Sequence, residues 1–315
     1  MTFRVLVSDK LDAKGTKALE AGAPLISVDV KVGLKPDEQQ AIIGEYDGLI
    51  VRSATKVNAA LLEKATKLKL VIRAGIGVDN IDIPRCKERG VVVENTPRGN
   101  VMSAAEHAIA LLMSLARQVP LASQTTKSGV WEKSKFMGTE LTGKTLGVIG
   151  TGNIGAVVVD RAQGLRLRVI AFDPALSDEK ARLMGVEKVD LDTLLGRADF
   201  ITMHVPLVPG TKHLLNDAAF SKMKKGVLIV NAARGGIIDE DALLRAIESG
   251  IVRGAALDVF EVEPASPTHP LFARDEVIAT PHLGASTFEA QVNVAVEAAE
   301  QMIAFAKDGT VINGL

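Results

Sequence analysis

The sequence predicts an α/β protein of two domains, each with a parallel sheet and helical crossovers. Three observations lead to this fold class. The chain has 315 residues and 47% hydrophobic content, whereas one domain typically takes about 100–200 residues. Short apolar runs alternate with polar stretches of helical periodicity, as in parallel strands joined by helices. A glycine-rich turn also follows one apolar run near the middle of the chain.

The first 95 residues alternate between predicted strands and predicted helices. The strands are expected at Arg4–Val7, Ile26–Val30, Gly48–Val51, Leu70–Ile72 and Val91–Glu94. The helices are expected near Ala13–Glu20, Pro36–Ile43, Ala59–Thr66 and Ile83–Arg89. This domain has no glycine fingerprint, so we expect it to supply groups that bind substrate and not the cofactor cradle.

The turn residues Asn95–Asn100 mark the predicted domain boundary, and a long helix is expected from about Val101 to Ser128. Seven strands suited to a doubly wound sheet should follow. They are expected near Thr145, Leu167, Val186, Phe200, Gly226, Gly254 and Val277. After His282, the sequence predicts a helix over Thr287–Lys307 and a short strand over Thr310–Asn313. This tail is expected to return to the first domain.

Residues 150–155 read Gly-Thr-Gly-Asn-Ile-Gly and follow the apolar strand Thr145–Ile149, which predicts a phosphate-binding turn between strand and helix. Gly150 permits the tight turn, and Gly152 lets backbone N–H groups approach a pyrophosphate. Gly155 allows the following helix to pack closely on its strand. The positive end of that helix dipole would face the anion. Asn153 and Ile154 complete the predicted loop.

Asp173 ends the next predicted strand, eighteen residues after Gly155. That spacing is close to the one expected for an acid that binds the ribose 2′-hydroxyl of a dinucleotide. A carboxylate at this position would repel a 2′-phosphate. The sequence therefore predicts NAD as the cofactor in preference to NADP.

Three polar residues of the second half are candidates for catalysis. Arg234 follows the apolar strand Val227–Val230 and has glycine neighbours, so its guanidinium could grip a carboxylate with two hydrogen bonds at the sheet edge. His282 is suited to proton exchange near neutral pH. Glu263, in a loop stiffened by Pro264, could bond one ring nitrogen of His282 and favour its charged form.

The other four histidines are weaker candidates. His107 is expected to pack or to form a hydrogen bond between helices, whereas His213 and His269 are expected to be solvated. His204 follows a predicted strand and could line the cofactor groove. No histidine pair has the spacing of metal ligands, so no catalytic metal is expected.

Composition limits the partners and the compartment. The 37 basic and 38 acidic residues nearly cancel, which gives no electrostatic reason to expect nucleic acid or an anionic membrane as a partner. Cys86 is the single cysteine and is expected to be a small apolar filler in a reducing compartment. No stretch approaches the ~18 apolar residues of a membrane span, and Phe3–Val7 opens the chain as a strand instead of a leader. We expect a cytoplasmic location.

Six runs resemble the D-2-hydroxyacid dehydrogenase family along nearly the whole chain. They are Arg52–Val57, Arg73–Asn80, Lys135–Leu141, Ala233–Gly236, Ala256–Phe260 and Pro281–Thr287. The first three are most similar to the family members that oxidise D-3-phosphoglycerate in the first step of serine biosynthesis. The resemblance implies a Rossmann-type NAD-binding domain over residues 99–282. It also implies a smaller, flavodoxin-like, discontinuous substrate-binding domain over residues 1–98 and 283–315.

The resemblance also implies roles for individual residues. The family's catalytic arginine, glutamate and histidine match Arg234, Glu263 and His282. Substrate would contact Arg52, Ser53, Ala74, Gly75, Arg234 and His282. Beyond the glycine loop, cofactor contacts would come from Asp173, His204, Pro206, Thr211, Ala232, Ala233, Arg234, Asp258, His282 and Gly284. Arg52 is the expected ligand of the distal phosphate of a phosphorylated 2-hydroxy acid.

In relatives the long helix after the boundary makes a dimer, and a partner arginine reaches the substrate near the position of Lys133. A homodimer or homotetramer is therefore expected, with a lysine at that contact. Long relatives continue into serine-binding domains, so this chain is either a short form or a truncated one. Two alternatives remain. The protein could be a hydroxypyruvate or glyoxylate reductase, or an NAD-responsive binding protein without catalysis.

Overall fold

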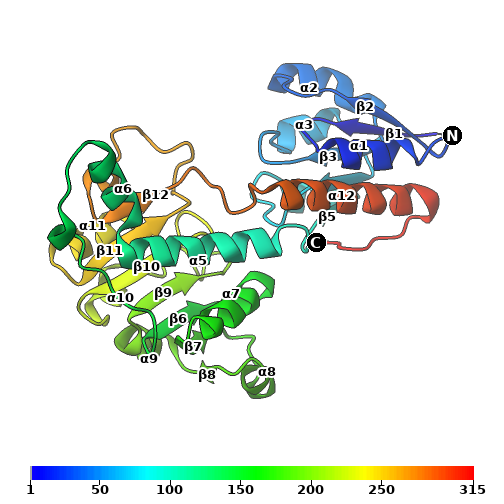
Figure 1. The fold of residues 1–315 in the computed structure, drawn as a ribbon. Coiled ribbons are helices and arrows are strands. Elements are labelled where there is room, and N and C mark those ends of the chain that lie inside the picture. The colour runs from blue at the N-terminus through cyan, green and yellow to red at the C-terminus, as the bar shows by residue number, and fades with distance from the viewer. Residues whose placement is uncertain (1) are drawn as a thin grey trace. The chain divides into compact units, whose positions relative to one another are not determined.

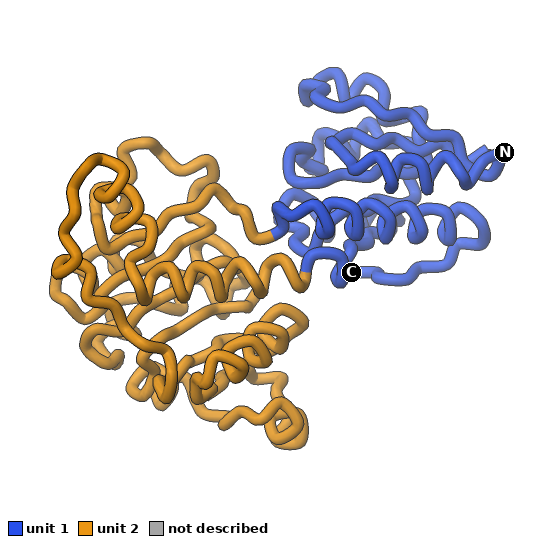
Figure 2. The backbone as a smooth tube through the Cα atoms, in the orientation of Figure 1, with its two compact units in different colours: residues 1–100, 285–315 blue, residues 101–284 orange. Residues whose placement is uncertain are grey.

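The computed structural model describes residues 2–315, which form two compact units (Figure 2). The first unit comprises residues 1–100 and 285–315, and the second comprises residues 101–284. The domain borders predicted from the sequence, after residues 98 and 282, lie two residues before the borders of these units.

The first unit contains a five-stranded sheet in which every strand pair is parallel. Its strands are β1 (Phe3–Val7), β2 (Ile26–Val30), β3 (Gly48–Val51), β4 (Leu70–Arg73) and β5 (Val92–Asn95). Their order is β2-β1-β3-β4-β5, which is the flavodoxin-like arrangement. β3 is buried along its whole length, which explains why its sequence is a continuous apolar run.

Five helices cover this sheet (Figure 1). They are α1 (Ala13–Glu20), α2 (Pro36–Ile42), α3 (Ala59–Lys64), α4 (Ile83–Glu88) and the C-terminal α12 (Phe288–Asp308). Four of them begin at side chains that accept a hydrogen bond from the first turn, Asp12, Asn58, Asp82 and Thr287. α12 lies against α1 so closely that a Cβ on Gly15 would stand 2.5 Å from the Cβ of Ala295.

The chain's tail returns to the first unit, but the predicted strand Thr310–Asn313 is wrong. Only an isolated antiparallel bridge between Glu94 and Gly314 forms there. The backbone N–H groups of Ile312 and Asn313 donate to the Glu94 carboxylate instead of to a neighbouring strand. A side chain of β5 therefore satisfies the donors that a ladder would have used.

The second unit contains a seven-stranded parallel sheet. Its strands are β6 (Thr145–Ile149), β7 (Arg168–Phe172), β8 (Glu187–Lys188), β9 (Phe200–Met203), β10 (Val227–Asn231), β11 (Val252–Leu257) and β12 (Val277–Ala279). The order is β12-β11-β10-β9-β6-β7-β8. The direction of winding reverses between β6 and β9, and doubly wound sheets bind ligands at the carboxyl edge of such a switch point.

Helices cover both faces of this sheet, as the doubly wound prediction requires. They are α5 (Val101–Arg117), α7 (Asn153–Gly164), α8 (Asp178–Leu183), α9 (Leu191–Arg197), α10 (Asp217–Ser221) and α11 (Glu240–Glu248). A further helix, α6 (Val119–Lys127), follows α5 and buries none of its own residues. Successive residues of β6 alternate between the two cores. Val148 packs in the cluster with α5 and α7, and Ile149 packs in the cluster with α9, α10 and α11.

The predicted single helix from Val101 to Ser128 is wrong, because it is broken at Gln118. That residue takes a left-handed φ of 53° between α5 and α6. Pro120 follows in the first turn of α6, and a proline ring clashes with the carbonyl four residues earlier in a continuous helix. The carbonyl in question, on Ala116, instead accepts the backbone N–H of Thr139 at 2.9 Å.

Candidate active site

Every predicted functional residue of the second unit lies at or just beyond the carboxyl end of a strand. The glycine loop follows β6, Asp173 follows β7 and His204 follows β9. The loops after β10, β11 and β12 carry Arg234, Glu263 and His282. Because all of these strands are parallel, their carboxyl ends share one edge of the sheet, where α/β folds bind ligands.

The glycine loop makes a turn that larger residues would obstruct. Gly150 has a φ of +92°, and a Cβ on Gly155 would lie 2.1 Å from the carbonyl oxygen of Gly150. At Gly152, the N-cap of α7, no described atom beyond the adjacent residues lies within 4 Å of the place that a Cβ would take. Asn153 and Ile154 open α7. The loop therefore leaves room at a helix N-terminus for the pyrophosphate of a dinucleotide.

Asp173 is tied to the glycine loop. Its Oδ2 accepts hydrogen bonds from the backbone N–H and the hydroxyl of Thr151 at 2.7 and 2.9 Å. Its Oδ1 accepts the N–H of Ala175 at 2.8 Å. Burial raises the pKa of this carboxyl, but the bonds from Thr151 and Ala175 outweigh it, so the pKa lies below its usual value. The residue is an ionised acceptor beside the loop, as a ribose ligand requires.

His204 lies behind the glycine loop. Its Nε2 is 3.1 Å from the hydroxyl of Thr202, and its carbonyl oxygen would be 2.7 Å from a Cβ on Gly150. Burial lowers the pKa of its imidazole to about 4, so the ring is neutral at physiological pH. Thr211 closes the following loop by donating to the carbonyl of Pro206 at 2.6 Å.

Glu263 and His282 form a pair, with Oε2 of Glu263 2.7 Å from Nδ1 of His282. The other oxygen of Glu263 accepts the backbone N–H of Phe260. Burial raises the pKa of Glu263, but the bond to His282 outweighs it, and the net shift is downward. An ionised carboxylate thus holds one ring nitrogen and leaves Nε2 of His282 for proton exchange.

Arg234 stands on a loop that Asn231 shapes at the end of β10. The Asn231 side chain accepts the N–H of Ala233 and donates to the carbonyl of Arg234, at 3.1 and 2.9 Å. Ala232 links the strand to this turn. A Cβ on Gly235 would lie 1.8 Å from the carbonyl oxygen of Phe260, so the loop of Arg234 packs directly on the loop of Glu263.

Asp258 is buried at the end of β11 and holds the loop of His282. Its Oδ1 accepts from the hydroxyl of Thr280 at 2.6 Å and the N–H of Leu283 at 2.7 Å, and its Oδ2 accepts the N–H of Gly284 at 2.8 Å. His282 itself has a left-handed φ of 56° and donates its N–H to the carbonyl of Asp258. Such a conformation costs about 1–3 kcal/mol and persists only when the surroundings enforce it.

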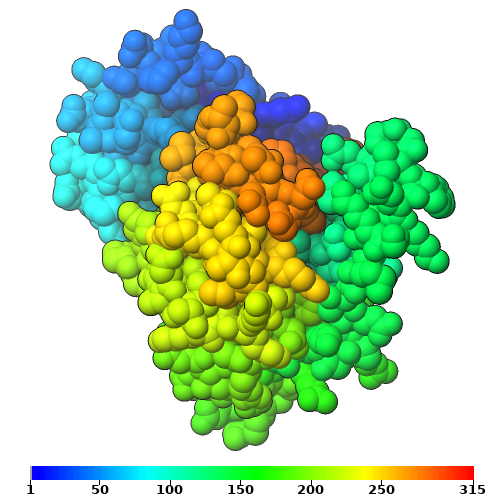
Figure 3. Space-filling model, turned by 90° about the vertical axis from the view of Figure 1, so that its left-hand side faces the viewer, coloured from blue at the N-terminus to red at the C-terminus, as the bar shows by residue number. Residues whose placement is uncertain are grey.

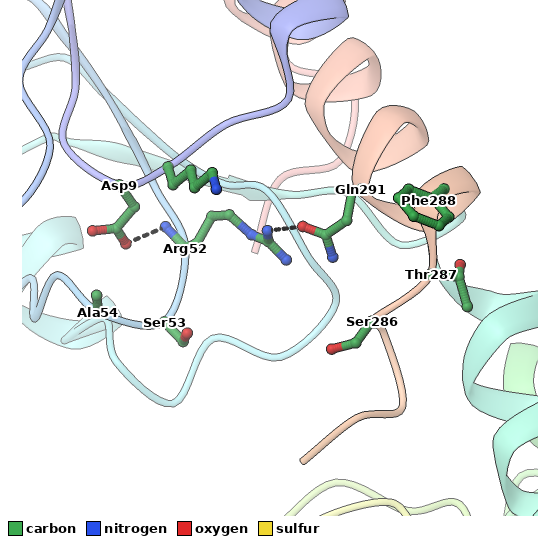
Figure 4. A pocket seen from close by; sticks show the side chains of 9 residues that line it. Asp9, Arg52, Ser53, Ala54, Ser286, Thr287, Phe288 and Gln291 are labelled. Carbon is green, nitrogen blue, oxygen red and sulfur yellow. Dashed lines mark hydrogen bonds between the residues drawn. The ribbon is translucent and has the colours of Figure 1, made fainter. Parts of the chain in front are cut away.

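The first unit has its own pocket, about 450 Å³, at the carboxyl edge of its sheet (Figure 4). It is lined by Asp9, Lys10, Arg52, Ser53, Ala54, Ser286, Thr287, Phe288 and Gln291. Asp9 fixes the loop after β3 by accepting the N–H of Arg52 at 2.6 Å and both the N–H and the hydroxyl of Thr55. The Arg52 guanidinium points toward Gln291 of α12 and donates to its side-chain oxygen.

Arg52 is half-buried, and burial lowers the pKa of its guanidinium in spite of the nearby Asp9 charge. Among residues 2–315, no carboxylate forms an ion pair with this side chain. Ala74 and Gly75 follow β4 in the same unit, where Gly75 has a φ of +153°. A Cβ there would meet the Arg73 side chain at 2.4 Å.

Sequence reasoning missed Asp9, Lys10, Gln291 and Asn231. Asp9 and Asn231 could have been found, because each lies at or just after the carboxyl end of a strand. Nothing in the sequence indicates that Gln291, which is 239 residues from Arg52, holds that side chain.

Two histidine predictions need correction, those for His107 and His269. His107 bonds the buried Asp258 at 3.1 Å and not another helix. His269 is not solvated, because its ring lies against Phe260 and Phe272 and its Nε2 is 2.9 Å from Glu240. His213 is partly exposed but is paired with Glu261 at 2.9 Å.

Comparisons with known proteins agree with this arrangement. The model of the D-isomer specific 2-hydroxyacid dehydrogenase family, NAD binding domain, matches residues 109–284. The D-3-phosphoglycerate dehydrogenase of Archaeoglobus fulgidus is 47% identical over 313 residues, which cover 99% of this chain and 59% of that protein. This chain therefore spans about three fifths of the relative's length.

Solved structures extend the similarity to the whole fold. A protein from Thermus thermophilus is 31% identical with a TM-score of 0.91, covering 99% of this chain and 100% of that one. D-lactate dehydrogenase from Aquifex aeolicus, complexed with NAD and lactic acid, is 28% identical with a TM-score of 0.86, covering 97% and 96%. The chain belongs to the D-isomer specific 2-hydroxyacid dehydrogenase family, whose NAD-binding domain it carries in residues 109–284.

Proposed function

We propose that the protein oxidises D-3-phosphoglycerate to 3-phosphohydroxypyruvate with NAD, the first step of serine biosynthesis. The observation that carries this proposal is the half-buried guanidinium of Arg52, which lines a pocket and has no carboxylate partner among the described residues. Buried charges are normally paired, so this cation favours an anionic ligand group. The name of the Archaeoglobus relative supports the same substrate.

The distal phosphate is assigned to Arg52, with Ser53 beside it on the same pocket wall. A phosphate monoester carries about −1.5 to −2 charges at neutral pH and accepts several charge-assisted hydrogen bonds. The planar guanidinium suits that geometry better than a lysine does. Ala74 and Gly75 are assigned to substrate through their backbone.

The chemical step is assigned to the loops of the second unit. Bound NAD supplies a hydride acceptor at its nicotinamide ring. The C2 hydroxyl loses its proton to Nε2 of His282 while C2 loses a hydride, which leaves a 2-keto acid. Glu263, at 2.7 Å from Nδ1, stabilises the imidazolium that forms. Arg234 holds the substrate carboxylate and polarises the forming carbonyl.

The test is NADH production from a panel of D-2-hydroxy acids, with NAD and NADP compared. D-3-phosphoglycerate should give the highest kcat/KM, and NAD should be preferred. A higher value for D-glycerate or D-lactate would replace the proposal with a reductase of phosphate-free acids. Saturable NAD binding without turnover of any acid would replace it with a binding function.

The proposal includes a homodimer that forms through α6 and the segment after it. α6 buries none of its own residues in this chain, and Trp131 and Met137 are 84% and 80% exposed. Figure 3 shows this segment in green, standing out on the surface. Exposed apolar surface of this kind marks interaction sites. Lys133 lies in a short 3₁₀ turn of the same segment and is the proposed contact to the partner's substrate.

Light scattering combined with size-exclusion chromatography tests the assembly. The wild-type protein should elute with twice the mass of one chain or a higher multiple. Trp131→Asp should shift it toward a monomer, whereas a monomeric wild-type protein would end this part of the proposal.

A cytoplasmic location completes the proposal. Among residues 2–315, no helix has both the length and the apolar character needed to cross a bilayer. The buried thiol of Cys86, whose pKa burial raises to about 11, fits a reducing compartment but does not require one. Cell fractionation with an antibody against the protein tests the location, and recovery in a membrane or secreted fraction would contradict it.

A further inference from the structure

The carboxylate of Asp258 accepts a fourth hydrogen bond, and its donor lies outside the loop that Asp258 holds. Nε2 of His107, on α5, lies 3.1 Å from Oδ1 of Asp258 and 3.4 Å from the hydroxyl of Thr280. The other three donors belong to Thr280, Leu283 and Gly284, which surround His282 in the chain. His107 therefore connects the Thr280–Gly284 loop to α5.

The neighbours of His107 require a hydrogen-bond donor at Nε2. The single hydroxyl hydrogen of Thr280 is directed at Asp258, at a distance of 2.6 Å. The hydroxyl oxygen and the carboxylate can then only accept. Nε2 of His107 must carry a hydrogen, and that hydrogen is shared between the two oxygens.

The electrostatics of the cluster depend on these donors. Asp258 has no exposed side-chain surface, and burial by itself raises the pKa of its carboxyl. The hydrogen bonds from His107, Thr280 and Leu283 outweigh that effect and bring the pKa below its usual value. Of these bonds, the one from His107 can be deleted by a substitution that leaves the loop sequence unchanged.

α5 is a rigid support for such a link. It packs along β10 and β11 and contributes buried leucines and alanines to the core on its face of the sheet. The ring of His107 is 19% exposed, so its position is set by the surrounding protein. Gly284 lies near Ala104, one turn before His107 on the same helix.

We propose that His107 is a positioning residue, which fixes the Asp258 carboxylate and, through it, the Thr280–Gly284 loop that sets the left-handed backbone of His282. This inference rests on the proposed function, because it assigns His107 to the geometry of the proton-transferring residue. It does not place His107 in contact with substrate.

Two substitutions separate this role from simple packing. His107→Leu replaces the imidazole with an apolar side chain and so removes the donor. His107→Gln places an amide N–H₂ where Nε2 of the imidazole lies and so restores a donor. Leu115→Val, two turns further along α5, is the control for a loss of packing, since Leu115 is buried in the core and its side chain has no hydrogen-bond donor.

The first readout is steady-state kinetics with NAD and D-3-phosphoglycerate. His107→Leu should lower kcat roughly 10–100-fold, the worth of a hydrogen bond to a charged group, with the KM for NAD within about twofold of wild type. His107→Gln should recover most of kcat, and Leu115→Val should leave kcat unchanged. Equal losses in the Leu and Gln variants, or wild-type kcat in His107→Leu, would overturn the proposal.

The second readout does not require turnover. Hydrogen exchange of the peptide that contains Leu283 and Gly284 should speed up at least about tenfold in His107→Leu, and not in His107→Gln, because those amides bond Asp258. Unchanged exchange in His107→Leu refutes the link whatever the enzyme acts on. A wild-type protein that does not oxidise D-3-phosphoglycerate refutes the proposed function and leaves this readout valid.

Discussion

Two buried aspartates, Asp9 in the first unit and Asp258 in the second, hold the loops that carry the proposed functional side chains. Each follows the carboxyl end of a strand, β1 or β11. Each accepts hydrogen bonds from the loop after the neighbouring strand. Asp9 fixes the loop of Arg52, and Asp258 fixes the loop of His282. In a parallel sheet, the loops that follow neighbouring strands lie side by side. An aspartate after one strand can therefore bind the loop after the next, and this occurs in both units.

The two clusters differ in their charge balance. Both oxygens of Asp258 are used, by four donors that include His107 from a helix, and the pKa of the carboxyl is lowered. The three bonds to Asp9 come from backbone and hydroxyl groups of one loop, and none comes from the Arg52 guanidinium. The Asp258 cluster thus includes a side chain from a helix of its own unit, whereas in the first unit the Arg52 guanidinium bonds Gln291 and forms no ion pair with a carboxylate of residues 2–315.

The largest expected effect concerns His282, whose loop Asp258 holds. His282→Ala should lower kcat by roughly 10²–10⁴-fold, because it removes the positioned acid–base group, while NAD affinity stays nearly unchanged. Stopped-flow turnover and NAD titration followed by fluorescence measure the two quantities. Near-normal turnover would show that the Asp258 cluster positions a residue without a chemical role.

The second unit contains all five histidines, and one of them should make the stability of the protein decrease as the pH falls. Burial lowers the pKa of His204 to about 4 from an ordinary 6.5. As the pH falls from 6.5 to 4, the unfolded chain takes up a proton that the folded chain does not. Stability should therefore decrease over this window by up to about 3 kcal/mol.

Urea unfolding at pH 7 and pH 4.5 measures this loss. His204→Gln keeps a polar partner for Thr202 but cannot titrate, so the variant should lose less stability than wild type between the two pH values. An identical loss in both proteins would show that His204 is protonated in the folded state.

The next prediction uses two substrates to separate the role of Arg52 in the first unit from that of Arg234 in the second. Arg52→Ala should lower kcat/KM for D-3-phosphoglycerate roughly 10–100-fold, because a charge-assisted contact is lost, and should alter a phosphate-free 2-hydroxy acid much less. Arg234→Ala should damage both substrates. Arg4→Ala, which removes two exposed ion pairs at the start of β1, is the matched control and should change neither substrate's kcat/KM. Equal losses for both acids in Arg52→Ala would refute the phosphate assignment.

The smallest expected effect concerns the cofactor. Asp173→Ala should narrow the gap in kcat/KM between NAD and NADP, by roughly tenfold, since both a ribose acceptor and a repulsive charge are removed. Thr151→Val removes a hydroxyl bond to the same carboxylate and should affect both cofactors alike. If the preference of Asp173→Ala equals that of wild type, Asp173 is not the ribose ligand.

Local patterns in the sequence predicted most of the fold. Apolar runs and helical periodicity found the strands and most of the helices, because each pattern is contained within a few residues. The glycine loop, Arg234, Glu263 and His282 could be proposed because each follows such a strand. The contact between His107 and Asp258 could not, since it joins residues far apart in the chain and a histidine in a helix is usually packing. The break at Gln118 is a local feature, and Pro120, two residues later, is a signal in the sequence that could have predicted it.

The first unit is built from two separate segments of the chain, and this limits when it can fold during synthesis. α12 supplies Val294, Ala298 and Met302 to the core that also contains Val5 and Leu19, and Gly15 admits the close contact between α1 and α12. During synthesis, the second unit, which is continuous, emerges complete before that helix does. Domains fold as units while the chain emerges. The N-terminal sheet therefore cannot complete its core until the whole NAD-binding domain has been synthesised. Until then, part of its apolar surface stays uncovered.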